Sequence, residues 1–191
     1  MHRALRTLGF TMLGLVTLAG VAPAKSFHIN PQAGVTATHL TSDPVDITDQ
    51  ARIGYALGGN LRLGGMVYLS PGVYYQRTAL ELSARDTLTA TTVKDVVGVN
   101  SLYLPLKLGA SLSGIRFYGG PALTIVTSVA ANDFGVVKDD YESSHTGFEA
   151  GVGFDIAVIT IDLSYEKGLG KVFKNDDAKQ DVLRAMVGIK I

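Results

Sequence analysis

The last segment of the chain alternates strictly between large apolar residues and polar or small ones. Its apolar positions are Leu183, Ala185, Val187, Ile189 and Ile191, and the positions between them are Arg184, Met186, Gly188 and Lys190. A period of two is the spacing of a β-strand, because successive side chains point to opposite faces, whereas a helix repeats about every 3.6 residues. The segment therefore predicts a strand with one apolar and one polar face.

Seven earlier segments show the same alternation, with more noise toward the N-terminus. They are residues 28–40, 52–57, 67–76, 101–111, 115–125, 147–156 and 159–166. The chain also contains 22 glycines and is rich in residues that favour strands. We therefore predict an all-β fold of eight antiparallel strands.

The connections between these strands are of two kinds, which alternate along the chain. Short turns are expected near residues 62–65, 113–114 and 157–158, and long polar connections at residues 41–50, 83–96, 130–145 and 170–181. Most of the Asp and Glu residues fall in or beside the long connections. Short turns at one end, long loops at the other and an even strand number are typical of an up-and-down transmembrane β-barrel.

The alternation alone does not decide which face of the barrel is the inner one. A soluble barrel such as a lipocalin buries its apolar face, whereas a membrane barrel turns that face toward lipid. Here the polar face is rich in glycine and its charges have mixed signs, which suits a narrow interior better than a solvated exterior. We therefore expect a structural network of charged side chains in the lumen. Its predicted members are Arg52, Lys107, Arg116, Glu149, Asp155, Asp162, Glu166, Arg184 and Lys190.

Aromatic residues on the apolar face fall near the two ends of the predicted strands. Tyr55, Tyr75, Phe148 and Tyr165 lie toward the long loops, and Phe117 and Phe154 toward the short turns. Lipid interfaces select two such belts. We therefore predict that these six residues lie at the membrane interfaces.

The N-terminal residues have the parts of a secretory signal peptide. Arg3 and Arg6 give a positive start, residues 8–21 form an apolar run, and a small-residue cleavage site ends at Ala24. The run is shorter than the about 20 residues that a helix needs to cross a bilayer. We expect a signal peptide at residues 1–24, followed at 25–191 by an outer-membrane barrel domain with its long loops outside the cell and its termini in the periplasm.

Four sequence runs resemble a known family. They are VYLSPGVYYQ (67–76), LYLPLKLGA (102–110), FYGGPAL (117–123) and GFEAGVGFDI (147–156). In their order and spacing they are similar to the PorT-like outer-membrane β-barrel proteins, over about residues 27 to 191. The resemblance implies a barrel of the OmpX type and no catalytic residue. One departure is that such barrels usually end in an aromatic residue, whereas this chain ends in Ile191.

Little in the sequence points to catalysis or metal binding. His39 and His145 lie near the long connections and Ser144 adjoins the latter, but no motif arranges them as a catalytic triad. The acidic runs at residues 139–142 and 176–181 lack the Asp-x-Asp-x-Asp-Gly spacing of a known Ca²⁺ loop. We therefore expect no enzyme activity, no cofactor and no metal.

The charge balance limits the partners. With 17 Lys and Arg against 17 Asp and Glu, the chain is close to neutral, which argues against a nucleic-acid partner. We expect a monomer whose partners are outer-membrane lipid and an extracellular ligand or protein reached through the long loops, and eight strands leave no room for a large pore. Two alternatives remain open: a soluble periplasmic barrel that binds an apolar ligand, and an outer-membrane enzyme that modifies lipid.

Overall fold

The computed structural model describes the strands and short turns of the chain. It covers residues 27–41, 52–85, 92–130, 142–170 and 179–191. The predicted signal peptide, residues 139–141 and 176–178 of the acidic runs, and the middle of each long connection lie outside these ranges, as do the side chains of residues 40–41, 52 and 79–97. No helix in the described residues is both long and apolar enough to cross a bilayer.

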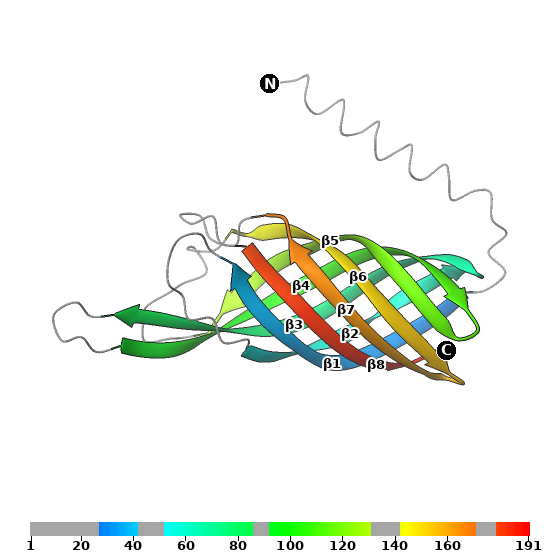
Figure 1. Ribbon diagram of the computed structural model, residues 1–191, viewed down its shortest axis with the longest axis horizontal. Helices are drawn as coiled ribbons and strands as arrows, with labels where there is room; N and C mark the ends of the chain where they lie inside the picture. Colours follow the sequence, from blue (N-terminus) through cyan, green and yellow to red (C-terminus); the bar gives the residue numbers. More distant parts are fainter. Residues whose placement is uncertain (1–26, 42–51, 86–91, 131–141, 171–178) are drawn as a thin grey trace, which may run out of the picture.

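The described residues form eight β-strands. Their bounds are β1 Phe27–Thr41, β2 Arg52–Gly64, β3 Val67–Arg85, β4 Thr92–Leu112, β5 Ile115–Val129, β6 Ser144–Ile156, β7 Ile159–Gly168 and β8 Lys179–Ile189. Each strand pairs antiparallel with the next, and β1 also pairs with β8, so that the sheet closes on itself (Figure 1). The predicted eight-stranded antiparallel up-and-down barrel is thus confirmed.

Tight turns connect the strands at one end of the barrel. Ser113 and Gly114 join β4 to β5 with φ angles of 51° and 86°, the positive values that a two-residue type I′ hairpin requires. Ala157 and Val158 join β6 to β7. The expected turn at residues 62–65 is displaced, because β2 continues to Gly64 and therefore includes Arg62.

The connection predicted at residues 83–96 is wrong. Here β3 and β4 stay paired as far as Arg85 and Thr92, so most of the expected loop is a β-hairpin. The paired partners of β3 on β2 end at Arg77, and those of β4 on β5 end at Val99. The hairpin therefore continues past the neighbouring strands as a two-stranded ribbon, which projects beyond the end of the barrel in Figure 1. The apolar positions change phase here, from Val73 and Tyr75 to Leu80 and Leu82, and the stretch is largely polar, which is why the sequence favoured a loop.

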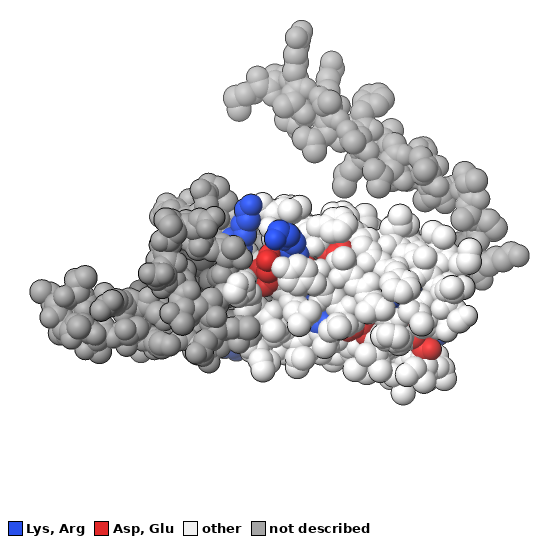
Figure 2. All heavy atoms as spheres, viewed as in Figure 1, with Lys and Arg blue, Asp and Glu red and all other residues white. Residues whose placement is uncertain are grey.

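Burial decides which face is inside. Leu163 and Val187 on the apolar face are 47% and 55% exposed, whereas Glu149 and Arg184 on the polar face are 2% and 3% exposed. Figure 2 shows that most of the visible face of the described strands carries no charge. A soluble barrel that binds an apolar ligand in its centre is therefore excluded, since the apolar side chains point outward and the polar ones fill the interior.

Candidate functional site

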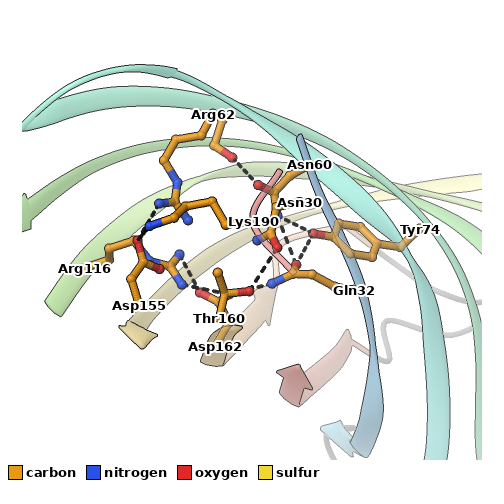
Figure 3. A network of polar contacts seen from close by, with 11 residues as sticks. Asn30, Gln32, Asn60, Arg62, Tyr74, Arg116, Asp155, Thr160, Asp162 and Lys190 are labelled. Atoms are coloured by element: carbon orange, nitrogen blue, oxygen red, sulfur yellow. Dashed lines mark hydrogen bonds and ion pairs between the residues drawn. The ribbon is translucent and has the colours of Figure 1, made fainter. Parts of the chain in front are cut away.

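The interior contains two groups of charged side chains. The first, which we call the short-turn cluster, comprises Arg62, Arg116, Asp155, Asp162 and Lys190 (Figure 3). Arg116 lies at its centre: the Nε atom is 2.7 Å from Asp155 Oδ1, and Nη1 and Nη2 are 2.9 and 3.1 Å from the two carboxylate oxygens of Asp162. A guanidinium that engages two carboxylates in this way fixes the relative positions of β5, β6 and β7.

Arg62 and Lys190 complete the short-turn cluster. Both contact Asp155 Oδ2, at 2.7 Å from Arg62 Nη1 and 3.5 Å from Lys190 Nζ. The Arg62 guanidinium also lies over the ring of Tyr68, 5.3 Å from its centroid. Arg62 was missed at the sequence level because it was placed in a turn; its even-numbered position, in phase with Asn60, was the available signal.

Uncharged polar side chains extend the cluster across the barrel. Gln32 Nε2 donates to Asp162 at 2.5 Å, and Gln32 Oε1 accepts from Asn60 Nδ2 at 3.0 Å and from the Tyr74 hydroxyl at 2.6 Å. Ser70 Oγ donates to Asn60 Oδ1 at 3.1 Å. These bonds connect β1, β2, β3 and β7, as Figure 3 shows. None of these amides was singled out from the sequence, because an uncharged polar residue does not reveal its partner.

We call the second group the long-loop cluster; it comprises Gln76, Tyr103, Glu149, Glu166 and Arg184. Arg184 Nη2 is 2.5 Å from Glu166 Oε2 and 3.1 Å from Gln76 Oε1, and the guanidinium lies 3.8 Å from the centroid of the Tyr103 ring. The Tyr103 hydroxyl donates to Glu149 at 2.7 Å. Buried charges of opposite sign thus lie close together here as well, because an unpaired charge in a nonpolar interior costs much free energy.

Lys107 lies between the two clusters and is held by aromatic rings. Its Nζ atom is 4.8 Å from the centroid of Tyr118 and 5.7 Å from that of Tyr74. A Cβ atom built at Gly151 would lie 2.6 Å from Tyr118 Cζ, so the glycine gives this ring its space. The structure therefore places every predicted lumen charge except Arg52, whose side chain is outside the description, in or between the two clusters.

The centre of the barrel is nearly filled. A cavity of about 10 Å³ remains between the clusters, lined among others by Tyr74, Tyr103, Lys107 and Tyr118. This is room for about one water molecule. The cavity can hydrate the charges around it, but it is too small for a solute.

The exterior carries the predicted aromatic residues. Tyr55, Tyr75, Phe117, Phe148, Phe154 and Tyr165 are between 42% and 62% exposed. Phe148 pairs with Lys167 near the long-loop end of β6 and β7, and Phe154 pairs with Ile161 toward the short turns. Aromatic side chains of this exposure on an apolar wall have the chemistry of residues at a lipid interface.

The residues considered for catalysis are not assembled. His39 is on the exterior of β1, whereas His145 is 7% exposed and faces the interior from β6, with Ser144 exposed on the outer face beside it. Within the described parts of the chain, no three His, Asp or Glu side chains are grouped as metal ligands. The charged side chains of the lumen are held close to charges of opposite sign.

Comparisons with known proteins agree with this geometry. No curated protein sequence matches the chain. The solved structure of Ail, the attachment invasion locus protein of Yersinia pestis, in complex with the heparin analogue sucrose octasulfate, is similar over 87% of this chain and 99% of its own, with 16% identity and a TM-score of 0.56. Neisserial surface protein A is similar over 86% and 97%, with 16% identity and a TM-score of 0.57.

These likenesses concern the fold, an outer-membrane barrel with its apolar face outward. The family match concerns the sequence as well as the fold: residues 18–174 match the outer membrane protein beta-barrel domain. Together with a closed barrel of eight strands and a lipid-compatible exterior, this match places the protein in the outer membrane. The chain belongs to the outer membrane protein beta-barrel domain family.

Proposed function

We propose that the protein is a monomeric, non-enzymatic barrel that presents its long-loop end to the outside of the cell for contact with an extracellular ligand or partner. The observation that carries this proposal is the filled interior, in which the two charged clusters leave a cavity of only about 10 Å³. The lumen charges then have a structural role, and the exterior aromatics anchor the barrel at the two lipid interfaces. We also propose that the barrel is of the PorT-like and OmpX type, which its sequence resembles.

A filled interior argues against transport through the barrel. Arg116, Asp162, Glu166 and Arg184 are each at most 4% exposed. Arg116 is hydrogen-bonded to Asp162 two strands away, and Arg184 is hydrogen-bonded to Glu166 on the neighbouring strand and to Gln76 on the opposite side of the barrel. Opening a path for a solute would separate these pairs, and leaving one buried charge unpaired costs about 3–5 kcal/mol. Eight strands also give an interior that side chains can fill, unlike the wide barrels of porins.

The long-loop end is the part of the molecule that is available for contact with a partner. The β3–β4 ribbon continues beyond the neighbouring strands and presents backbone that is not paired with β2 or β5. Ail, which has a similar fold, was solved with a heparin analogue, and this supports ligand contact as a role for a barrel of this size. Loops carried on a rigid barrel are a frequent place for such binding.

The orientation can be tested with epitope tags on intact cells. One tag is inserted in the connection at residues 86–91 and a matched tag between Ser113 and Gly114, in the short turn at the other end. We expect antibody to label intact cells that carry the first tag, and cells with the second tag only after the outer membrane is opened. The reverse pattern, with both variants folded, would refute the proposed orientation.

The closed interior can be tested by conductance. The purified barrel in a planar bilayer is expected to show no stable large channel, and liposomes that contain it should not swell in small sugars. A porin of known size is the positive control. Swelling at a rate close to that of the porin would contradict a structural lumen and would favour transport.

A further inference from the structure

Four prolines lie inside the strands of the barrel, and three of them are close together. They are Pro31 on β1, Pro71 on β3, Pro105 on β4 and Pro121 on β5. In the strand pairing, Pro71 is opposite Leu106, which adjoins Pro105 and lies opposite Pro121 in the register of β4 with β5. Pro71, Pro105 and Pro121 therefore form a line across three neighbouring strands, which we call the proline row.

Each proline of the row coincides with a break in the hydrogen-bonded pairing, because proline has no backbone N–H. The pairing of β2 with β3 is interrupted beside Pro71, that of β3 with β4 beside Pro105, and that of β4 with β5 beside Pro121. The pairing of β5 with β6, β6 with β7 and β7 with β8 has no such break. Since lipid offers no replacement for a lost backbone hydrogen bond, three adjacent breaks weaken the wall along one line.

The backbone at the proline row is also suited to bending. Gly72 follows Pro71, and Gly120 precedes Pro121. Proline and glycine inside a strand are typical of bends and of places where another strand approaches closely. A Cβ atom at Gly72 would lie 3.1 Å from Cγ of Pro105 on the next strand, so the strands do approach closely here. Neighbouring strands can therefore bend at the same level.

The lumen holds β3 and β4 less firmly than the other strands. Among the described side chains, the ion pairs join β2, β5, β6, β7, β8 and Lys190, and none involves β3 or β4. The one buried cation of β4, Lys107, contacts aromatic rings. Hydrogen bonds such as those of the Tyr74 and Tyr103 hydroxyls hold the two strands instead. The part of the wall with interrupted pairing thus also lacks ion pairs across the lumen.

We propose that the proline row is a hinge, about which the long-loop parts of β3, β4 and β5 tilt relative to the rest of the barrel. One kinked strand would be held in place by its neighbours, whereas aligned kinks in three adjacent strands allow a common bend. The β3–β4 ribbon continues directly from the tilting part (Figure 1), so that a small tilt at the row displaces the ribbon. The hinge lies in the wall itself and does not depend on which end of the barrel faces outward.

Pro31 provides a matched control. It is also an exterior proline inside a strand, and the pairing of β1 with β8 is interrupted beside it, between Ile29 and Gln32. On its other side, however, the pairing of β1 with β2 is continuous over residues 27–38 of β1. Pro31 therefore removes a bond of the same kind without belonging to a line of breaks. The hinge predicts different effects of Pro31 and of the proline row.

The test measures the tilt in the mature barrel in lipid nanodiscs. Because the chain has no cysteine, spin labels can be attached at chosen exterior positions. Arg77→Cys with Leu183→Cys joins the tilting part of β3 to β8, and Val67→Cys with Val187→Cys joins β3 to β8 on the short-turn side of the row. Pulsed electron paramagnetic resonance gives the distribution of distances for each pair. We expect a wider distribution for the first pair than for the second.

The double variant Pro71→Ala/Pro121→Ala restores two N–H donors and leaves the buried Pro105 in place. We expect it to narrow the distribution of the first label pair to the width of the second, and we expect Pro31→Ala to leave the first pair unchanged. Hydrogen exchange is a second readout. Amides of residues 72–74 and 104–106 should exchange faster than those of β7, and the double variant should slow them about fivefold, the factor for one hydrogen bond of about 1 kcal/mol.

The proposal would be overturned by equal widths of the two label pairs in the wild type, which would show that the wall is rigid. It would also be overturned if the double variant, folded by circular dichroism, left the first pair as wide as before, or if Pro31→Ala narrowed it equally. If the double variant did not fold, the two wild-type label pairs and wild-type hydrogen exchange would decide. Epitope labelling of cells tests the orientation separately, so each result stands without the other.

Discussion

The two ends of the barrel interior are held together in different ways. In the short-turn cluster, Asp155 contacts three cations and Asp162 receives two bonds from Arg116 and one from Gln32. In the long-loop cluster, Arg184 is the one shared group: it contacts Gln76, Glu166 and the Tyr103 ring, and Tyr103 in turn donates to Glu149. Beyond it, toward the loops, the buried interior side chains include Val99, Val126 and Val182.

This difference predicts that the two clusters contribute unequally to the stability of the barrel. The short-turn cluster connects β2, β5, β6, β7 and Lys190, the residue after β8, through shared carboxylates, so that removing one group disturbs several others. The long-loop cluster has fewer shared groups, and its loss should be more local. We therefore expect the short-turn end to determine stability, while the long-loop end has more freedom to vary. The structural role of the lumen charges stays a prediction, which the following variants test.

The largest effect is expected for Asp162→Ala. The change removes the buried acceptor of Gln32 and one of the two carboxylates that pair with Arg116, so that three cations share Asp155 alone. We expect a loss of about 3–5 kcal/mol in the free energy of unfolding. Urea unfolding in lipid vesicles, followed by circular dichroism, measures this loss. Asp162→Asn, which keeps the shape and one acceptor, should lose less. A loss for Asp162→Ala no greater than that for a surface variant would remove the basis for the comparison.

A smaller effect is expected for Glu166→Gln in the long-loop cluster. The amide oxygen can still accept from Arg184, and Gln76 remains as a second acceptor, so only the charge is lost. Hydrogen bonds to charged groups are worth about 1.5–3 kcal/mol, and we expect a loss at the lower end of this range. The same unfolding assay applies. If Glu166→Gln proved more destabilising than Asp162→Asn, the two ends would have to be ranked in the opposite order.

Glycines that lie beside the two clusters allow the same comparison, because adding a methyl group there disturbs one cluster at a time. A Cβ atom at Gly153 would meet Asp162 and lie 2.6 Å from Arg116 Cζ, whereas one at Gly147 would meet the flexible end of Glu166. We expect Gly153→Ala to cost about 1–3 kcal/mol and Gly147→Ala less, because a single glutamate can move aside. Gly65→Ala, where no atom lies within 4 Å, is the matched control and should change stability by less than about 0.5 kcal/mol.

Salt should have the smallest effect. Raising the ionic strength from about 0.01 M to about 1 M shortens the Debye length from about 30 Å to about 3 Å, but it screens buried pairs little. The side chains of the Arg116–Asp162 and Arg184–Glu166 pairs are at most 6% exposed. We therefore expect the free energy of unfolding to change by less than about 0.5 kcal/mol. A large fall in salt would indicate that water and ions enter the lumen freely.

The local pattern of the sequence was enough to predict most of the fold. Alternation with a period of two assigned nearly every strand and both faces, because side-chain direction in a strand depends only on position along the chain. The prediction failed at strand ends that were assigned to connections although the alternation continues there: β3 and β4 continue to Arg85 and Thr92, and β2 includes Arg62. In both places the strand continues because it is paired with a neighbouring strand. The sequence of one segment does not show how far that pairing extends.

By itself, the sequence determined that the chain forms strands with one apolar and one polar face, and which charged residues lie on the polar face. Only the tertiary structure decided their partners: that Arg116 joins Asp155 to Asp162, that Arg184 lies on Tyr103, and that Lys107 lies between two rings. The physical reason is that these contacts join different strands, some of them on opposite sides of the barrel. They depend on the register of all the strands and on the closure of β1 with β8, and no local pattern contains that information.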